Sequence, residues 1–176
     1  MTRSAWGQGL ATRTSKGQVL DTWYPSPRLG EPDGSTLDAL ANLATVDDAR
    51  GVSREVVTTV IDLDAVPTSA EDAYLRLHLL SHRLVAPHGC NLTGIFGLLT
   101  NVVWTTAGPC AVEDFEVTRM RLLARGPVQV FGVDKFPRLV DYVLPSGVRV
   151  ADGDRVPLGA RFAPGAPWRP AASVNS

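Results

Sequence analysis

The stretch LPSGVRVADGDRVPLGARFAPGAPWRPAASV, residues 144–174, decides the fold, because its apolar residues recur every six positions. The anchors of this repeat are Leu144, Val150, Val156, Phe162, Trp168 and Val174, and Ala160, Ala166 and Ala172 each follow one anchor by four positions. A six-residue period fits neither a strand nor a helix. It is typical of a parallel β-helix, in which each hexad forms one flat side of a triangular coil. The repeat therefore predicts that the chain enters a parallel β-helix.

The repeat is short. At most five hexads fit between residues 144 and 174, fewer than two full turns of such a coil. A coil of this kind needs about three or more stacked repeats to bury its hydrophobic interior. We therefore expect a globular domain at residues 1–143, followed at residues 144–176 by the first coils of an incomplete β-helix.

Upstream of the hexads, patterns typical of strands and helices alternate. The pattern predicts a hairpin from residues 7–12 and 19–24, strands at 55–63, 95–105 and 128–133, and helices at 37–44, 68–85 and 112–125. Ser35 or Thr36 is the expected cap of the first helix, and Thr68 with Glu71 matches a capping box for the second. Such an alternation predicts an α/β or α+β domain in which helices cover a sheet.

Composition excludes several classes of function. The 176 residues are 44% hydrophobic and 20% charged, with a net charge of -1 and a pI near 6.3. This balance supplies no basic field for nucleic acid or an anionic membrane. Residues 1–11 lack the apolar region of a secretory signal, and no segment reaches the roughly 20 apolar residues of a membrane span. We therefore expect a cytoplasmic protein in which Cys90 and Cys110 are reduced.

Few side chains upstream of the hexads suggest chemistry. His78 and His82 are four residues apart on the second predicted helix, so they share a face and could bind a metal together. The His-Glu-x-x-His pattern is absent, however, and hydrogen-bonded or solvated helix histidines are the favoured interpretation. Cys110 follows Pro109 with no histidine nearby in the sequence, which favours a small buried thiol over a nucleophile.

The segment leading into the hexads is richer in charge. Asp134-Lys-Phe-Pro-Arg138 follows a predicted strand, where ligand-binding residues often lie, although a solvated turn with an internal ion pair is the favoured interpretation. The guanidinium of Arg149 could bind a carboxylate in bidentate fashion. Asp152 and Asp154 lie at the entrance to the coil. Two interpretations of Asp154 are open. In a trimeric β-helix, three copies of this aspartate at the axis would repel one another and need a cation to neutralise them. Alternatively, Asp154 is a turn-favouring residue at a corner of the coil.

Long blocks of the sequence resemble one enzyme family. They are DAYLRLHLLSHRLVAPHG at 72–89, LTNVVWT at 99–105 with GPCA at 108–111, RGPV at 125–128, GVDKFPR at 132–138, DYV at 141–143, GVR at 147–149 and ADGDRV at 151–156. Together they resemble the N-terminal domain of tetrahydrodipicolinate N-succinyltransferase of the actinobacterial type. The resemblance extends over roughly residues 7–165 and is weakest between Pro25 and Glu55.

This resemblance implies a function. Enzymes of the family transfer succinyl from succinyl-CoA to the amine of ring-opened tetrahydrodipicolinate, a step of diaminopimelate and lysine biosynthesis. They are homotrimers whose left-handed β-helices pack around a three-fold axis, with active sites between neighbouring subunits. The resemblance implies that Arg149 binds a carboxylate of the dicarboxylate substrate, and that Asp154 binds a magnesium ion on the trimer axis.

The chain departs from the family after Gly165. In the family, the catalytic glutamate and nearly all contacts to CoA lie on later coils, whereas this sequence continues as APWRPAASVNS, residues 166–176. We therefore expect no catalytic residue in this chain and no succinyltransferase activity from the chain alone. The alternative is a non-catalytic association module that trimerises or joins full-length subunits.

Overall fold

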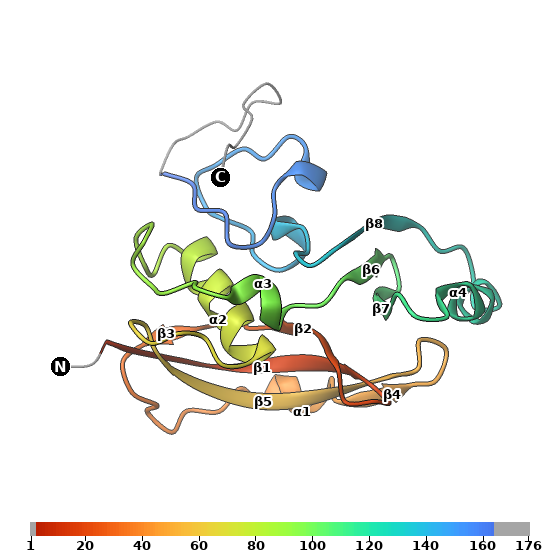
Figure 1. The fold of residues 1–176 in the computed structure, drawn as a ribbon, viewed down its shortest axis with the longest axis horizontal. Coiled ribbons are helices and arrows are strands. Elements are labelled where there is room, and N and C mark those ends of the chain that lie inside the picture. Colours follow the sequence, from red (N-terminus) through yellow and green to blue (C-terminus); the bar gives the residue numbers. More distant parts are fainter. Residues whose placement is uncertain (1–2, 164–176) are drawn as a thin grey trace.

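A five-stranded antiparallel sheet is built from the first third of the chain. The computed structural model describes residues 3–163 (Figure 1). The strands are β1 (Ser4–Thr14), β2 (Val19–Trp23), β3 (Arg28–Leu29), β4 (Thr45–Asp47) and β5 (Val52–Asp62), in the order β2-β1-β5-β4 with β3 also paired to β1. The predicted hairpin is confirmed as β1 and β2. All eleven residues of β1 pair with β5, from Ser4 opposite Asp62 to Thr14 opposite Val52.

Helix α2 (Ala70–Ser81) is the centre of the core. In Figure 1 it lies between the large sheet and the connector that leads into the hexads. Ten of its twelve residues are buried, so it is covered on nearly all sides rather than along one stripe. The main core joins side chains from β1, β5 and α2 to side chains of the connector, residues 135–143, and of the hexads. From the connector it takes Leu139 and Val143, and from the hexads Val156 and Leu158. Residues on both sides of position 144 therefore share one core.

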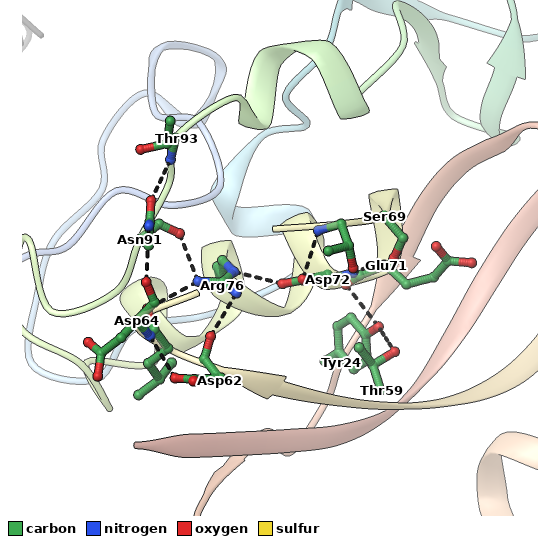
Figure 2. Close-up of polar contacts among 12 residues, drawn as sticks. Tyr24, Thr59, Asp62, Asp64, Ser69, Glu71, Asp72, Arg76, Asn91 and Thr93 are labelled. Carbon is green, nitrogen blue, oxygen red and sulfur yellow. Dashed lines mark hydrogen bonds and ion pairs between the residues drawn. The ribbon is translucent and has the colours of Figure 1, made fainter. Parts of the chain in front are cut away.

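A buried arginine fixes α2 to the sheet. The side chain of Arg76 is 1% exposed and pairs with Asp72, one turn earlier on the helix, at 2.6 Å. Its other nitrogens donate to the backbone carbonyls of Asp62, Leu63 and Asn91 at 2.8–3.2 Å (Figure 2). The buried charge is thus neutralised and every nitrogen has an acceptor, as a buried guanidinium requires.

A smaller three-stranded sheet stands beside the first. Its order is β7 (Gly108–Ala111), β6 (Val102–Thr105), β8 (Val130–Asp134), and both pairings are antiparallel. Helix α4 (Phe115–Leu123) packs on it through a separate core of Ala49, Val103, Cys110, Phe115 and Leu122. Two short helices complete the fold, α1 (Asp38–Ala41) beside β5 and α3 (Ile95–Leu98) beside α2. The predicted α+β domain of helices on a sheet is confirmed.

Three local predictions are wrong. Residues 95–105 are not one strand, because Gly94, with a φ of +78°, starts the helical turn α3 and only Val102–Thr105 is extended. Helix α1 has Leu37 at its N-cap and no side-chain cap, so neither Ser35 nor Thr36 caps it. The N-cap of α2 is Ser69, whose hydroxyl accepts from the Asp72 N–H at 3.1 Å, rather than Thr68.

The hexads follow the expected pattern only in part. Val156 is buried, and Val150, Ala160 and Phe162 pack against the main core, but Leu144 is 82% exposed and is not an interior anchor. No strand forms between residues 144 and 163, whose regular structure is limited to a 3₁₀ turn at Gly153–Arg155. The remaining anchors and spacer alanines, namely Ala166, Trp168, Ala172 and Val174, lie outside the described residues. Among the helices of residues 3–163, none is long and apolar enough to cross a membrane.

Candidate functional site

Arg138 and the predicted site residue Asp154 lie on two segments that cross. Arg138 and Pro157 form an antiparallel bridge, the Leu139 N–H donates to the Val156 carbonyl at 2.8 Å, and the Leu158 N–H donates to the Pro137 carbonyl at 2.9 Å. The apolar side chains on either side of this crossing are buried in the main core. The crossing therefore fixes the turn that carries Asp154 beside the segment that carries Arg138.

Arg138 is the most highly connected charge of this region. Its Nε and Nη2 donate to the two carboxylate oxygens of Asp141 at 2.9 and 3.0 Å, and its Nη1 donates to Asp154 at 2.5 Å. Its guanidinium also lies 3.7 Å from the centroid of the Phe131 ring. The two carboxylates, that of Asp141 first, raise the pKa of Arg138. The sequence interpretation of 134–138 as a turn with an internal ion pair is thus corrected, because this arginine pairs outside the turn.

Asp154 is exposed at the surface. Its carboxylate is 64% exposed, and its backbone N–H donates to Asp152, which caps the 3₁₀ turn. Within residues 3–163 no group of three or more metal-binding side chains comes together. The Asp154 carboxylate is already paired with Arg138, so the donors of one chain fit a magnesium ion only if other subunits contribute the remaining ligands.

Arg149 lies apart from this ion-pair cluster. Its residue is exposed, and no carboxylate of residues 3–163 lies within ion-pair distance of its guanidinium. The described part of the chain therefore leaves this guanidinium able to bind an external carboxylate. The structure brings Asp154 and Arg138 together, but it gives no contact between either of them and Arg149.

A partly buried aromatic residue anchors the connector in the domain. The hydroxyl of Tyr142 donates to Asp21 on β2, and its backbone carbonyl accepts from the Trp23 indole N–H at 3.1 Å. Asp21 is buried, and this burial raises the pKa of its carboxyl group despite the hydrogen bond from Tyr142. The ring of Tyr142 meets those of His78 and Trp104 edge to face. This anchor holds the entrance to the hexads against the large sheet.

His78 has a structural role. The His78 ring is fully buried, with Nδ1 2.7 Å from the Tyr74 carbonyl and Nε2 accepting from the Tyr24 N–H at 3.2 Å. Both ring nitrogens are thereby occupied in the neutral form, and burial lowers the pKa of His78 to about 3. The His82 ring stacks on it at 6.4 Å, and burial lowers the pKa of His82 as well. The favoured interpretation of hydrogen-bonded helix histidines is confirmed for His78.

Both cysteines are buried and free. Burial raises the pKa of each thiol, so neither carries the thiolate character of a nucleophile. The interpretation of Cys110 as a small buried thiol is confirmed.

Sequence reasoning did not find the partners of three polar residues that the fold uses. Arg76 has a detectable signal, since Asp72 and Arg76 stand four apart on an otherwise apolar helix. Arg138 and Tyr142 have none, because their partners Asp154 and Asp21 are distant in the sequence and meet only after folding.

The arrangement of these elements matches a solved enzyme structure. A crystal structure from Campylobacter jejuni, described as a 2,3,4,5-tetrahydropyridine-2-carboxylate N-succinyltransferase, superposes with a TM-score of 0.74, covering 94% of this chain and 56% of that chain. The two sequences are 22% identical, so this likeness concerns the fold. The fold is thus of the class found in an N-succinyltransferase.

Sequence comparison narrows the class to a family. Residues 99–138 match the family model for the middle region of tetrahydrodipicolinate N-succinyltransferase. The 2,3,4,5-tetrahydropyridine-2,6-dicarboxylate N-succinyltransferase of Salinispora tropica is 49% identical over 93% of this chain and 54% of its own length. The enzyme of the same name from Pseudomonas paraeruginosa is 53% identical over 64% of this chain and 33% of its own length.

The family resemblance inferred from the sequence is therefore confirmed. The chain is homologous to the tetrahydrodipicolinate N-succinyltransferases, and it spans about half the length of the Salinispora tropica relative, 54% of which it covers.

Proposed function

We propose that this chain forms part of an enzyme that transfers succinyl from succinyl-CoA to the amine of ring-opened tetrahydrodipicolinate, in the cytoplasm, in diaminopimelate and lysine biosynthesis. The observation that carries the proposal is the 49% identity to a named N-succinyltransferase across 93% of the chain. In this proposal residues 1–143 form the N-terminal domain, and residues 144–176 begin a left-handed parallel β-helix.

Arg149 is the proposed binding group for a carboxylate of the substrate. A guanidinium can bind a carboxylate through two parallel hydrogen bonds. The exposure of Arg149, and the absence of an ion-pair partner for it among residues 3–163, support this role. Arg138 is a weaker candidate, since two carboxylates already occupy it.

Asp154 is the proposed ligand of a magnesium ion on the axis of a homotrimer. Its exposed carboxylate supports the role. A hard cation such as magnesium is bound by oxygen ligands and can neutralise several carboxylates that would otherwise repel one another. One Asp154 carboxylate supplies too few oxygen ligands for a magnesium ion, so in this proposal the Asp154 residues of three subunits share the site.

Exposed apolar side chains support self-association. On α4, Val117, Met120 and Leu123 are 49%, 63% and 52% exposed and follow one another at a spacing of three residues, so they share one side of the helix. Val133 on the outer strand β8 is 57% exposed. Apolar surface of this kind is typical of protein interfaces. It also favours the second candidate function, an association module without catalysis.

The test of activity is a CoA-release assay with succinyl-CoA and the cyclic substrate. The 176-residue chain assayed alone is expected to give no turnover, because the resemblance places the catalytic glutamate outside the matched residues. Turnover within about a hundredfold of a complete relative would contradict this expectation. A second assay uses the 176-residue chain mixed with a complete relative. If the substitution Arg149→Gln in the 176-residue chain raises KM for the dicarboxylate and leaves KM for succinyl-CoA unchanged, the substrate role of Arg149 is supported.

Solution mass separates the two candidate functions. A stable trimer of the 176-residue chain, or mixed trimers with a complete relative, would favour the association module. A monomer that gains activity only when joined to the remaining half of a relative would favour the enzyme.

A further inference from the structure

The charged segment at 134–138 has no role in the function proposed so far, although its arginine contacts one of the proposed site residues. The crossing of residues 137–139 with 156–158 places Arg138 and Asp154 side by side through backbone hydrogen bonds, independently of their side chains. Arg138 and Asp154 then meet at 2.5 Å.

Arg138 is held much more firmly than Asp154. Its side chain is 22% exposed, and it is fixed by the two-pronged pair with Asp141 and by the face of the Phe131 ring. Asp154 is 64% exposed and stands on a short turn. A fixed guanidinium beside an exposed carboxylate restricts the rotamers of the carboxylate, because charge-assisted hydrogen bonds are directional. The arginine therefore sets the direction in which Asp154 points.

We propose that Arg138 is a positioning residue for Asp154, and that it competes with a divalent cation for the same carboxylate. The cation half of this proposal rests on the proposed function, which assigns Asp154 as a magnesium ligand. The guanidinium orients Asp154 and neutralises it while no cation is bound, and it weakens the electrostatic attraction for a cation that binds there. Repulsion among three Asp154 carboxylates would then be reduced even without magnesium.

The chain offers a matched control. Arg155 is next to Asp154 in the sequence, but its guanidinium pairs with Asp152 at 3.3 Å and is 66% exposed. Arg138→Gln and Arg155→Gln each remove one positive charge near the turn. Only Arg138→Gln removes the group that contacts Asp154.

The first experiment measures binding of Mn²⁺ alone to the metal-stripped 176-residue chain by solution EPR. Arg138→Gln is expected to bind Mn²⁺ about two- to fivefold more tightly than the parent, the range for losing one exposed ion pair. Arg155→Gln is expected to change the affinity by less than half as much, and Asp154→Asn to abolish the gain from Arg138→Gln. Equal effects of the two arginine variants, or weaker binding by Arg138→Gln, would overturn the competition.

The second experiment needs no cation. A double-mutant cycle of Arg138→Gln and Asp154→Asn, followed by urea unfolding in EDTA, is expected to show a coupling of about two- to fivefold in the unfolding equilibrium constant. Additive effects would overturn the positioning role. If the parent and Asp154→Asn bind Mn²⁺ equally, the cation role assigned under the proposed function fails together with the competition, and the cycle alone decides whether Arg138 positions Asp154.

Discussion

At the scale of single residues, burial decides what the polar side chains of α2 do. His78 and Arg76 both lie on this helix and are almost completely buried, so neither is available to a ligand. The fold uses them to satisfy the backbone N–H of Tyr24, just after β2, and backbone carbonyls of β5 and of the loop at Asn91. Such residues contribute to stability, and their contribution can be measured.

Removing the Arg76 side chain is expected to be costly. Arg76→Leu leaves the buried Asp72 carboxylate without its partner and removes the side-chain donors to three backbone carbonyls, which predicts a loss of about 3–5 kcal/mol in the free energy of unfolding. Arg119→Leu serves as the control, because its pair with Glu116 is largely exposed and is worth at most about 1 kcal/mol. Urea unfolding measures the free energy of unfolding of both variants. Equal losses would show that the buried network stabilises the protein no more than an exposed ion pair does.

His78 predicts a pH dependence of stability. Its pKa is about 3 when folded, against 6.5 in the unfolded chain, so the unfolded state binds the proton first. The free energy of unfolding therefore falls as pH drops below 6.5, by about 2 kcal/mol at pH 5, and the loss continues down to pH 3. We expect His78→Phe to unfold with a shallower pH dependence between pH 6.5 and 5 than the parent. Parallel profiles for the two proteins would contradict the assignment of a buried neutral imidazole.

At the scale of elements, two overlapping cap motifs compete at the start of α2. Thr68 with Glu71 and Ser69 with Asp72 both fit the spacing of a capping box. The tertiary fold selects the second, because Arg76 pairs with Asp72 inside the core and Arg13 on β1 pairs with Glu71. The Asp72 carboxylate then also accepts the Thr68 N–H at 3.0 Å.

Substitution distinguishes the two caps. Ser69→Ala removes the acceptor for the Asp72 N–H and is expected to cost about 1 kcal/mol of stability. Thr68→Ala, one residue earlier, should change stability by less than about 0.5 kcal/mol. Thermal unfolding of the two variants measures both losses of stability. A larger loss from Thr68→Ala than from Ser69→Ala would favour the cap predicted from the sequence.

At the scale of the whole molecule, the connector and the start of the hexads pack against the main core. Val156 and Leu158 are buried against α2, and Tyr142 joins the connector to β2. Residues before and after position 144 should therefore unfold together. We expect far-UV circular dichroism and tryptophan fluorescence to report one coincident transition. Two separate transitions would show that the hexads form an independent unit.

Two leucines of the hexad segment, of which only Leu144 is an anchor of the repeat, should differ accordingly in their contribution to stability. Leu158→Ala is expected to cost about 2–5 kcal/mol, because it removes a buried side chain from the main core. Leu144→Ala should cost less than about 0.5 kcal/mol, since Leu144 is 82% exposed. Urea unfolding measures the free energy of unfolding of both variants. A large loss from Leu144→Ala would indicate that Leu144 is buried, as the six-residue repeat predicts.

The sequence by itself determined the elements with strong local signals and the family. Two extended segments flanking Ser15-Lys16-Gly17 encode the hairpin, and β-branched residues encode β5. Helical spacing encodes α2 and α4, and extended blocks of identity encode the homology. Local patterns carry this information because hydrogen bonding and side-chain direction repeat with a fixed period.

Only the tertiary structure decided how the polar residues are used. The apolar run at 95–105 divides into a helical turn and a strand, a result that its composition does not specify. The pairs Arg138–Asp154 and Tyr142–Asp21 join residues 16 and 121 positions apart, so no local pattern encodes them. Partner choice at such distances follows from the backbone crossing and from burial, which raises the cost of leaving any charge or donor without a partner.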